Sequence, residues 1–143
     1  MNTLSLKIVN EYLEIPKHIV GTTTIDLPCL GHKKEYAVQA IGKNIRFRMI
    51  IRRGNRRLSL TIHKMTRDNV GMFRLDINGS EHILDNGKKS RNHIHYYTEE
   101  YGLRKAKELP REFNNTLSDH VAIVGKALDY LNIKAVTIQN ELL

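Results

Sequence analysis

Apolar and polar residues alternate in three successive segments near the middle of the chain, the pattern of half-buried β-strands. In residues 45–52 and 57–63, aliphatic and aromatic side chains form one face and mainly arginines and other polar side chains the other, with a turn between the segments. A third alternating segment covers 71–78, and we expect further strands at 35–41 and 92–98. Because sequential strands usually pair with their neighbours, the pattern predicts an antiparallel β-meander of about four to six strands.

Helical spacing of apolar residues occurs near both ends of the chain. Residues 3–14 form one amphipathic stretch that stops before Pro16, and residues 118–132 form another, with Ser118 as the expected N-cap. Residues 135–138 are expected to form a short terminal strand. An N-terminal and a C-terminal helix packed on one face of the meander give an expected α+β fold.

The chain has 143 residues, enough for one domain with its own core, and we expect residues 1–143 to form a single domain. It lacks the roughly 18 consecutive apolar residues of a membrane-spanning helix. The N-terminus does not have the pattern of a signal peptide, and Cys29 is the only cysteine. We therefore expect a cytoplasmic protein without membrane association or an internal disulfide.

Positive charge is concentrated in one part of the chain. The formal net charge is +8, and no Asp or Glu occurs between Tyr36 and Arg67. Such a block is typical of a surface that binds a polyanion such as RNA. A solvated face, or a face for an acidic protein partner such as an antitoxin, would also explain it. The expected nucleic-acid-binding residues are Arg46, Arg48, Arg52, Arg53, Arg56 and Arg57, with Tyr97 as the tyrosine that stacks on a base.

Histidines and an acid gather around two of the expected strands. Arg74 and Asp76 share one face of segment 71–78, His93 and His95 share one face of segment 92–98, and His82 lies in the polar loop between them. If Ile94 points into the core, both strand histidines lie on the outward face with Arg74 and Asp76. This cluster could bind a metal, promote phosphodiester cleavage or be purely structural.

Metal-free phosphodiester chemistry is the functional interpretation that these residue types favour. His93 or His95, and also His82, would be the acid or base, Arg74 would hold the phosphate, and Asp76 would orient an imidazole. We expect no metal, because the neighbouring arginines disfavour a cation and the spacing matches no standard zinc motif. No Gly-rich phosphate loop or nucleophile elbow is present, so no nucleotide cofactor is expected.

The residues from Arg74 to Gly102 carry a longer motif. The chain reads Arg-Leu-Asp-Ile-x-Gly, then His82, then Asp-x-Gly, then His-Ile-His-x-Tyr, then Glu-Tyr-Gly. This motif resembles a family of small bacterial and prophage proteins classed as a domain of unknown function, a likeness that covers most of the chain but implies no mechanism. Ser80, Asn92 and Leu103 depart from the family pattern, at places where prolines and a tryptophan are expected.

The chain also resembles TumE-type toxins of toxin–antitoxin pairs at the arginine, aspartate and histidine positions of the cluster. This resemblance implies a small toxin directed at RNA and held by a partner protein. The expected function is therefore that of a small basic bacterial or phage-derived protein that acts on RNA, as a toxin-like, metal-independent endoribonuclease. The alternatives are a non-catalytic module that binds nucleic acid or blocks a nucleic-acid enzyme, and a protein with a structural histidine cluster.

Overall fold

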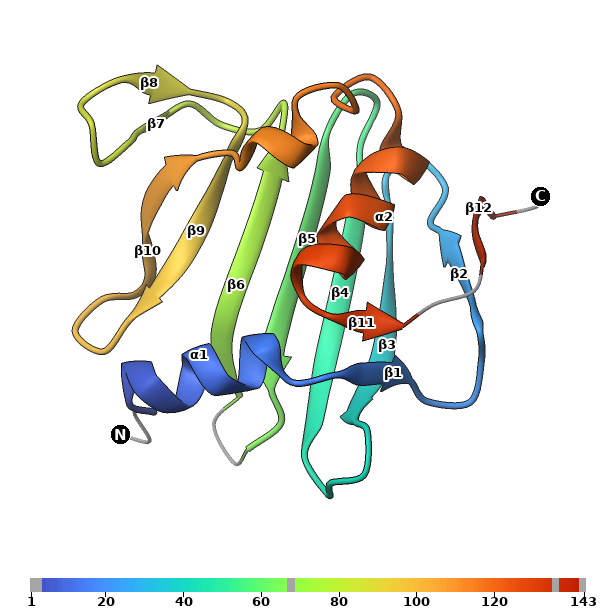
Figure 1. The fold of residues 1–143 in the computed structure, drawn as a ribbon. Coiled ribbons are helices and arrows are strands. Elements are labelled where there is room, and N and C mark those ends of the chain that lie inside the picture. Colours follow the sequence, from blue (N-terminus) through green and yellow to red (C-terminus); the bar gives the residue numbers. More distant parts are fainter. Residues whose placement is uncertain (1–3, 67–68, 135–136, 142–143) are drawn as a thin grey trace.

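A large twisted β-sheet organises the protein. The computed structural model describes residues 4–66, 69–134 and 137–141. Its main sheet has eight strands in the order β10-β9-β6-β5-β4-β3-β1-β11 (Figure 1). The strands of this sheet are β1 (Lys17–Ile19), β3 (His32–Ala40), β4 (Arg46–Arg53), β5 (Leu58–Lys64), β6 (Val70–Ile77), β9 (His93–Thr98), β10 (Gly102–Glu108) and β11 (Ile133–Lys134).

Two smaller strand pairs and three helical segments complete the fold. β2 (Thr24–Leu27) pairs in parallel with β12 (Thr137–Asn140), and β7 (His82–Ile83) pairs antiparallel with β8 (Lys89–Ser90). The helices are α1 (Leu6–Glu14), the 3₁₀ turn η1 (Arg111–Phe113) and α2 (His120–Tyr130). No helix in the described residues is long and apolar enough to cross a membrane.

The alternating pattern of β4 explains the two faces of the sheet. Phe47, Met49 and Ile51 are buried, while the residues between them are exposed or half-buried. Strands β3, β4, β5, β6, β9 and β10 pair antiparallel in this order, with the β7–β8 hairpin inserted between β6 and β9. The predicted antiparallel meander and α+β class are therefore confirmed.

Both α-helices pack on the apolar face of the sheet, as expected (Figure 1). The ring of Tyr12 on α1 meets Phe47 edge-on with centroids 5.7 Å apart, and Tyr130 on α2 lies 5.3 Å from Phe73. The expected N-cap of α2 was wrong by one residue. Asp119 caps this helix, and its Oδ1 accepts a hydrogen bond from the backbone N–H of Ala122.

Strict alternation in segment 71–78 predicts Met72 on the polar face of β6, together with Arg74 and Asp76, and this prediction was wrong. The register of β5 and β6 shifts between Ile62 and His63, so Ile62 pairs with Phe73 while His63 pairs with Gly71. Met72 is the extra residue of this β-bulge, and it is fully buried in the core. A bulge interrupts the strict alternation of faces, which a pattern of period two cannot anticipate.

Strand β10 was not expected from the sequence. It is the edge of the main sheet, and most of its residues are polar and exposed, so it lacks the apolar alternation of a half-buried strand. The expected terminal strand at 135–138 corresponds in part to β12, although residues 135 and 136 lie outside the described ranges. A tight turn is present at Asp85, Asn86 and Gly87, as these turn-forming residue types predict, and Gly87 has a φ of 83°, which glycine adopts without strain.

Lys17 connects the C-terminal ends of the two α-helices. Its side chain is 0% exposed, and Nζ donates hydrogen bonds to the carbonyl oxygens of Leu13, Ile15 and Leu131 at 2.9, 3.0 and 2.7 Å. Leu13 and Ile15 end α1, and Leu131 is the C-cap of α2. A buried cation is favourable at these carbonyls because the C-terminus of a helix carries partial negative charge.

We expect the Lys17→Met variant to lower the free energy of unfolding by about 2–4 kcal/mol, because it leaves three carbonyl oxygens at the helix ends without their donor. Urea denaturation followed by circular dichroism would measure this loss. Lys43→Met is the matched control, since Lys43 is exposed in the turn after β3. Equal stability of the two variants would contradict the role of Lys17.

Lys17 should also give stability a pH dependence. Burial lowers the pKa of Lys17 from 10.5 to about 8. At pH values between about 8 and 10.5, Lys17 is therefore protonated in the unfolded chain and neutral in the folded protein. Because the unfolded state binds more protons there, the contribution of Lys17 to the unfolding free energy rises with pH over this range. This rise should be present in the wild type and missing from Lys17→Met.

Candidate functional site

The register between β6 and β9 brings the predicted site residues together. Asp76 pairs with His93 and Arg74 pairs with His95, on the sheet face opposite the α-helices. Leu75 and Ile94, which pair with each other between them, are buried. The expectation that Ile94 points into the core and the two histidines to the polar face is therefore confirmed.

These pairs belong to rows of side chains that cross the sheet. The row through Asp76 and His93 continues from β6 to β5, β4 and β3. Neighbouring strands lie about 4.8 Å apart, so the row forms a continuous polar stripe. Its members, from β3 to β9, are Lys33, Arg52, Ser59, Asp76 and His93.

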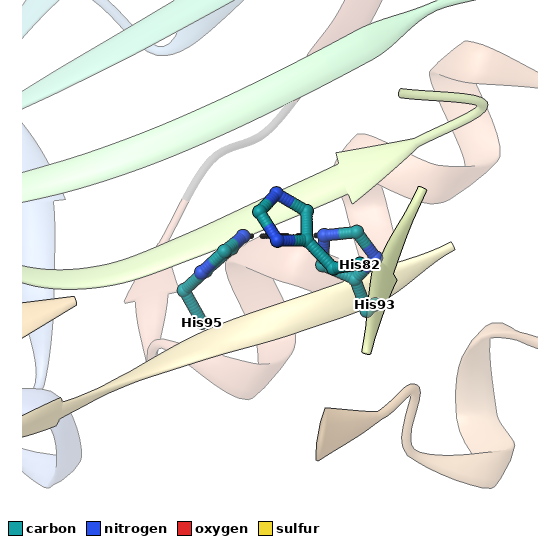
Figure 2. A group of neighbouring side chains, drawn as sticks. All are labelled: His82, His93 and His95. Carbon is teal, nitrogen blue, oxygen red and sulfur yellow. Dashed lines mark hydrogen bonds between the residues drawn. The ribbon is translucent and has the colours of Figure 1, made fainter. Parts of the chain in front are cut away.

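Three imidazole rings converge at the β9 end of this stripe (Figure 2), and the Asp76 carboxylate lies beside two of them. His93 and His95 face each other with their Nε2 atoms 3.2 Å apart, and the ring of His82 lies with its centroid 4.9–5.0 Å from both. Asp76 Oδ2 lies 3.1 Å from His95 Nε2 and 3.5 Å from His93 Nε2. We refer to Asp76, His82, His93 and His95 as the His–Asp cluster.

Backbone carbonyl groups fix the two inner rings. His93 Nδ1 lies 3.1 Å from the carbonyl oxygen of Ser90, and His95 Nδ1 lies 2.9 Å from that of Leu103. A carbonyl oxygen only accepts hydrogen bonds, so each Nδ1 carries a proton and donates it. In their neutral forms, both rings therefore turn an Nε2 lone pair toward Asp76 and toward each other, so the hydrogen bond from His95 Nε2 to Asp76 Oδ2 requires a second proton on His95.

The inner part of the cluster is buried, which the sequence did not indicate. His93 is 0% exposed and His95 and Asp76 are each 6% exposed, although they lie on the polar face. His82, in the segment that contains β7 and β8, packs its ring against both inner histidines. Asp85 anchors this segment, since it donates its backbone N–H to the Ala106 carbonyl and accepts a hydrogen bond from the Tyr96 hydroxyl. His82, in contrast, is exposed.

Burial and hydrogen bonding set the charges in the cluster. Burial alone would raise the pKa of Asp76, but the hydrogen bond with His95 and the adjacent Arg74 outweigh it and hold this pKa below its ordinary value. Burial lowers the pKa of His93, Asp76 opposes this shift, and His95 and His82 add to it. At neutral pH, Asp76 is therefore negative and His93 neutral.

A basic cleft of about 690 Å³ runs over the polar face to the His–Asp cluster. Its lining includes both Asp76 and His82, and it also includes Arg74, whose Nε donates to Asp76 Oδ1 at 3.0 Å while half of its side chain remains exposed. The basic residues that line it are Lys33, Arg52, Arg53, Arg57 and Arg74. Lys33 was not among the expected binding residues, and its pairing with Arg52 across β3 and β4 is the reason that it lies here.

The other predicted arginines have different places. Arg53 lines the cleft, but its guanidinium is engaged with His120 Nδ1 and Asn140 Oδ1, so it joins the end of β4 to the start of α2 and the end of β12. Arg56 lines a neighbouring hollow beside the start of α2. Arg46 and Arg48 lie further along β4 and are not among the residues that line the cleft.

The prediction that Tyr97 stacks on a base does not agree with its position. Tyr97 is 5% exposed, belongs to the core, and donates its hydroxyl hydrogen to the Leu4 carbonyl oxygen at 2.6 Å. Residues that precede α1 therefore cover it. Tyr101 remains exposed, with the Lys105 ammonium over its ring.

The His–Asp cluster also has the donor atoms of a metal site. One ring nitrogen from each of His82, His93 and His95 lies within 4.8 Å of the others, and Asp76 adds a carboxylate oxygen. Imidazole and carboxylate are ligands of zinc and of other first-row transition metals. The arrangement is therefore chemically suited both to proton transfer and to metal binding.

Residues 4–133 match DUF6978, a family of unknown function. The chain belongs to this family. No curated protein and no solved structure matches it. Membership in DUF6978 confirms the predicted resemblance to a domain of unknown function, and the matched region contains the whole cleft and the His–Asp cluster.

We expect Asp76→Asn to lower the free energy of unfolding by about 1–3 kcal/mol, because it removes the buried negative charge beside Arg74 and His95 and replaces one acceptor oxygen with an amide donor. Arg74→Gln should cost less, about 0–1 kcal/mol, since the Arg74 side chain is half exposed. Urea denaturation with a chelator present would compare the two variants. A larger loss for Arg74→Gln would show that Asp76 is not the anchor of the cluster.

Proposed function

We propose that this protein binds RNA along the basic cleft and cleaves its phosphodiester backbone at the His–Asp cluster. The observation that carries this proposal is the continuity of the two features. Arg52, Arg57 and Arg74 line the same cleft as Asp76 and His82. A phosphate held by arginines in this cleft would lie beside the groups that can transfer protons.

The exposure of the side chains assigns different roles within the site. His82 and Arg74 reach the cleft and would contact the substrate, with Arg74 on a phosphate oxygen. His93 is fully buried, so it would orient and polarise its neighbours rather than touch the RNA. This modifies the sequence-based hypothesis, in which His93 or His95 was the acid or base.

The wider biological role is also a proposal. A small basic RNA-directed protein of bacterial or phage origin that acts as a toxin in the cytoplasm would need an acidic partner protein to restrain it. The open, positively charged cleft supports this role, because an acidic segment could occupy it in place of RNA. The alternative is a non-catalytic module that uses the same cleft to bind nucleic acid or a nucleic-acid enzyme.

RNA binding should depend on the cleft arginines. For single-stranded RNA, the double variant Arg52→Gln, Arg57→Gln should weaken binding and reduce the slope of log affinity against log salt by about 1.4, since each phosphate contact contributes about 0.7. Fluorescence anisotropy over a series of salt concentrations would measure this slope.

The matched control is the double variant Lys7→Gln, Lys126→Gln. It removes the same charge from exposed positions on α1 and α2, which lie on the other face of the sheet. Its slope should equal that of the wild type. If both double variants reduce the slope equally, binding is not located in the cleft, and if the wild type shows no salt-sensitive binding, the proposal fails.

RNA cleavage should depend on His82. A positioned acid or base contributes typically 10²–10⁴-fold, so His82→Ala should lower the cleavage rate by about this factor. His32→Ala is the control, because His32 is exposed and lines the same cleft but is not part of the cluster. Cleavage would be followed on labelled RNA, once in chelator and once with added divalent metal. If the folded wild type cuts no RNA under either condition, the binding module is the better account.

A further inference from the structure

Asp76, His82, His93 and His95 together have the donor atoms, the spacing and the supporting hydrogen bonds of a metal centre. We propose that the His–Asp cluster binds one divalent transition-metal ion, Zn²⁺ on its geometry, at the end of the basic cleft. The consequence for RNA rests on the proposed function, whereas ion binding itself requires no RNA. This proposal replaces the sequence-based expectation of a metal-free cluster.

The spacing of three donor atoms fits a tetrahedral zinc ion. Zn–N and Zn–O bonds of about 2.0–2.1 Å place tetrahedral ligand atoms about 3.3–3.4 Å apart. His93 Nε2 and His95 Nε2 are 3.2 Å apart, and Asp76 Oδ2 lies 3.5 and 3.1 Å from them. These three atoms therefore form one face of a coordination tetrahedron. A ring nitrogen of His82 lies within 4.8 Å of those of the other two histidines and would move closer to them to supply the fourth ligand.

Hydrogen bonds outside the cluster hold these ligands in the state that a metal requires. The Ser90 and Leu103 carbonyl oxygens accept the Nδ1 protons of His93 and His95, which leaves both Nε2 lone pairs free. Arg74 binds Oδ1 of Asp76 and leaves Oδ2 for the ion. Metal-bound histidines in proteins usually have such a second hydrogen bond, which fixes the tautomer and the ring orientation.

The alternative occupant of the centre is a proton. Three acceptor atoms that converge within 3.5 Å repel one another unless a positive charge lies between them. An extra proton on one imidazole could meet this need, as could a metal ion. The experiment below therefore measures the ion directly.

The nearby arginines do not prevent cation binding. Arg74 is the arginine in contact with the cluster. Its guanidinium forms an ion pair with Asp76 and its side chain is half exposed, so solvent and Asp76 weaken its repulsion of a metal ion. The remaining arginines of the cleft are Arg52 and Arg53 at the end of β4 and Arg57 directly before β5. Since His82 lines the cleft, a bound phosphate would approach the ion from the His82 side, either as a fifth ligand or by displacing His82.

The test uses the full chain without a histidine tag, with Zn²⁺ and Co²⁺ as the probes. We expect elemental analysis after dialysis to find one zinc ion per chain, and the Co²⁺ form to show the intense visible absorption of a four-coordinate ion. His82→Ala and Asp76→Asn should each weaken Zn²⁺ affinity, measured by competition with a chelator, by more than the 10–100-fold that is typical of outer-shell changes. Circular dichroism would verify that both variants are folded.

His18→Ala is the matched control, because His18 is exposed on β1 and far along the sheet from β9. It should keep the wild-type affinity and Co²⁺ spectrum. The proposal is overturned if folded wild type retains no stoichiometric ion, or if His18→Ala weakens binding as much as the cluster variants do. Zinc binding without RNA cleavage would support the metal site and reject the proposed function. RNA cleavage by a protein that binds no zinc would support the proposed function and reject the metal site.

Discussion

The register between β6 and β9 is the constraint on which the candidate site depends. Leu75 and Ile94 pair with each other and are buried, which fixes the neighbouring pairs, Asp76 with His93 and Arg74 with His95, on the opposite face. A slip of one residue would exchange the two faces of β9 and place both histidines among the core side chains. The hydrophobic core therefore determines the position of the polar cluster, although the two lie on opposite sides of the sheet.

The segment with β7 and β8 completes the His–Asp cluster. It brings His82 to the other two rings, and its Asp85 is attached to Tyr96 and to the backbone of β10. Enclosure removes water from the Asp76 carboxylate and its histidine neighbours, and charges interact more strongly where water is excluded. The same four side chains on an open sheet would be weakly coupled. Here they form a unit with one exposed member at the cleft.

Stability and the proposed chemistry rely on different faces of the molecule. Both α-helices lie on one face of the main sheet (Figure 1). The apolar core and the Lys17 connection between the helix ends belong to this side, while the cleft uses the opposite face. Substitution of exposed cleft residues such as Arg52 is therefore expected to change binding with little effect on folding. Asp76, His93 and His95 are the exceptions, because their burial couples the candidate site to the fold.

The sequence by itself determined the elements whose pattern is local. Alternation predicted the central strands and the face of Arg74, Asp76, His93 and His95, and helical spacing predicted α1 and α2, because both periods follow from backbone geometry. Tertiary structure alone decided what covers each face. It buried His93 and set the ring of His82 against it, and it buried Tyr97 under the residues before α1. It also recruited the polar β10 as an edge strand and placed Met72 in a bulge. These outcomes depend on contacts between segments far apart in the chain, and a periodic pattern carries no information about such contacts.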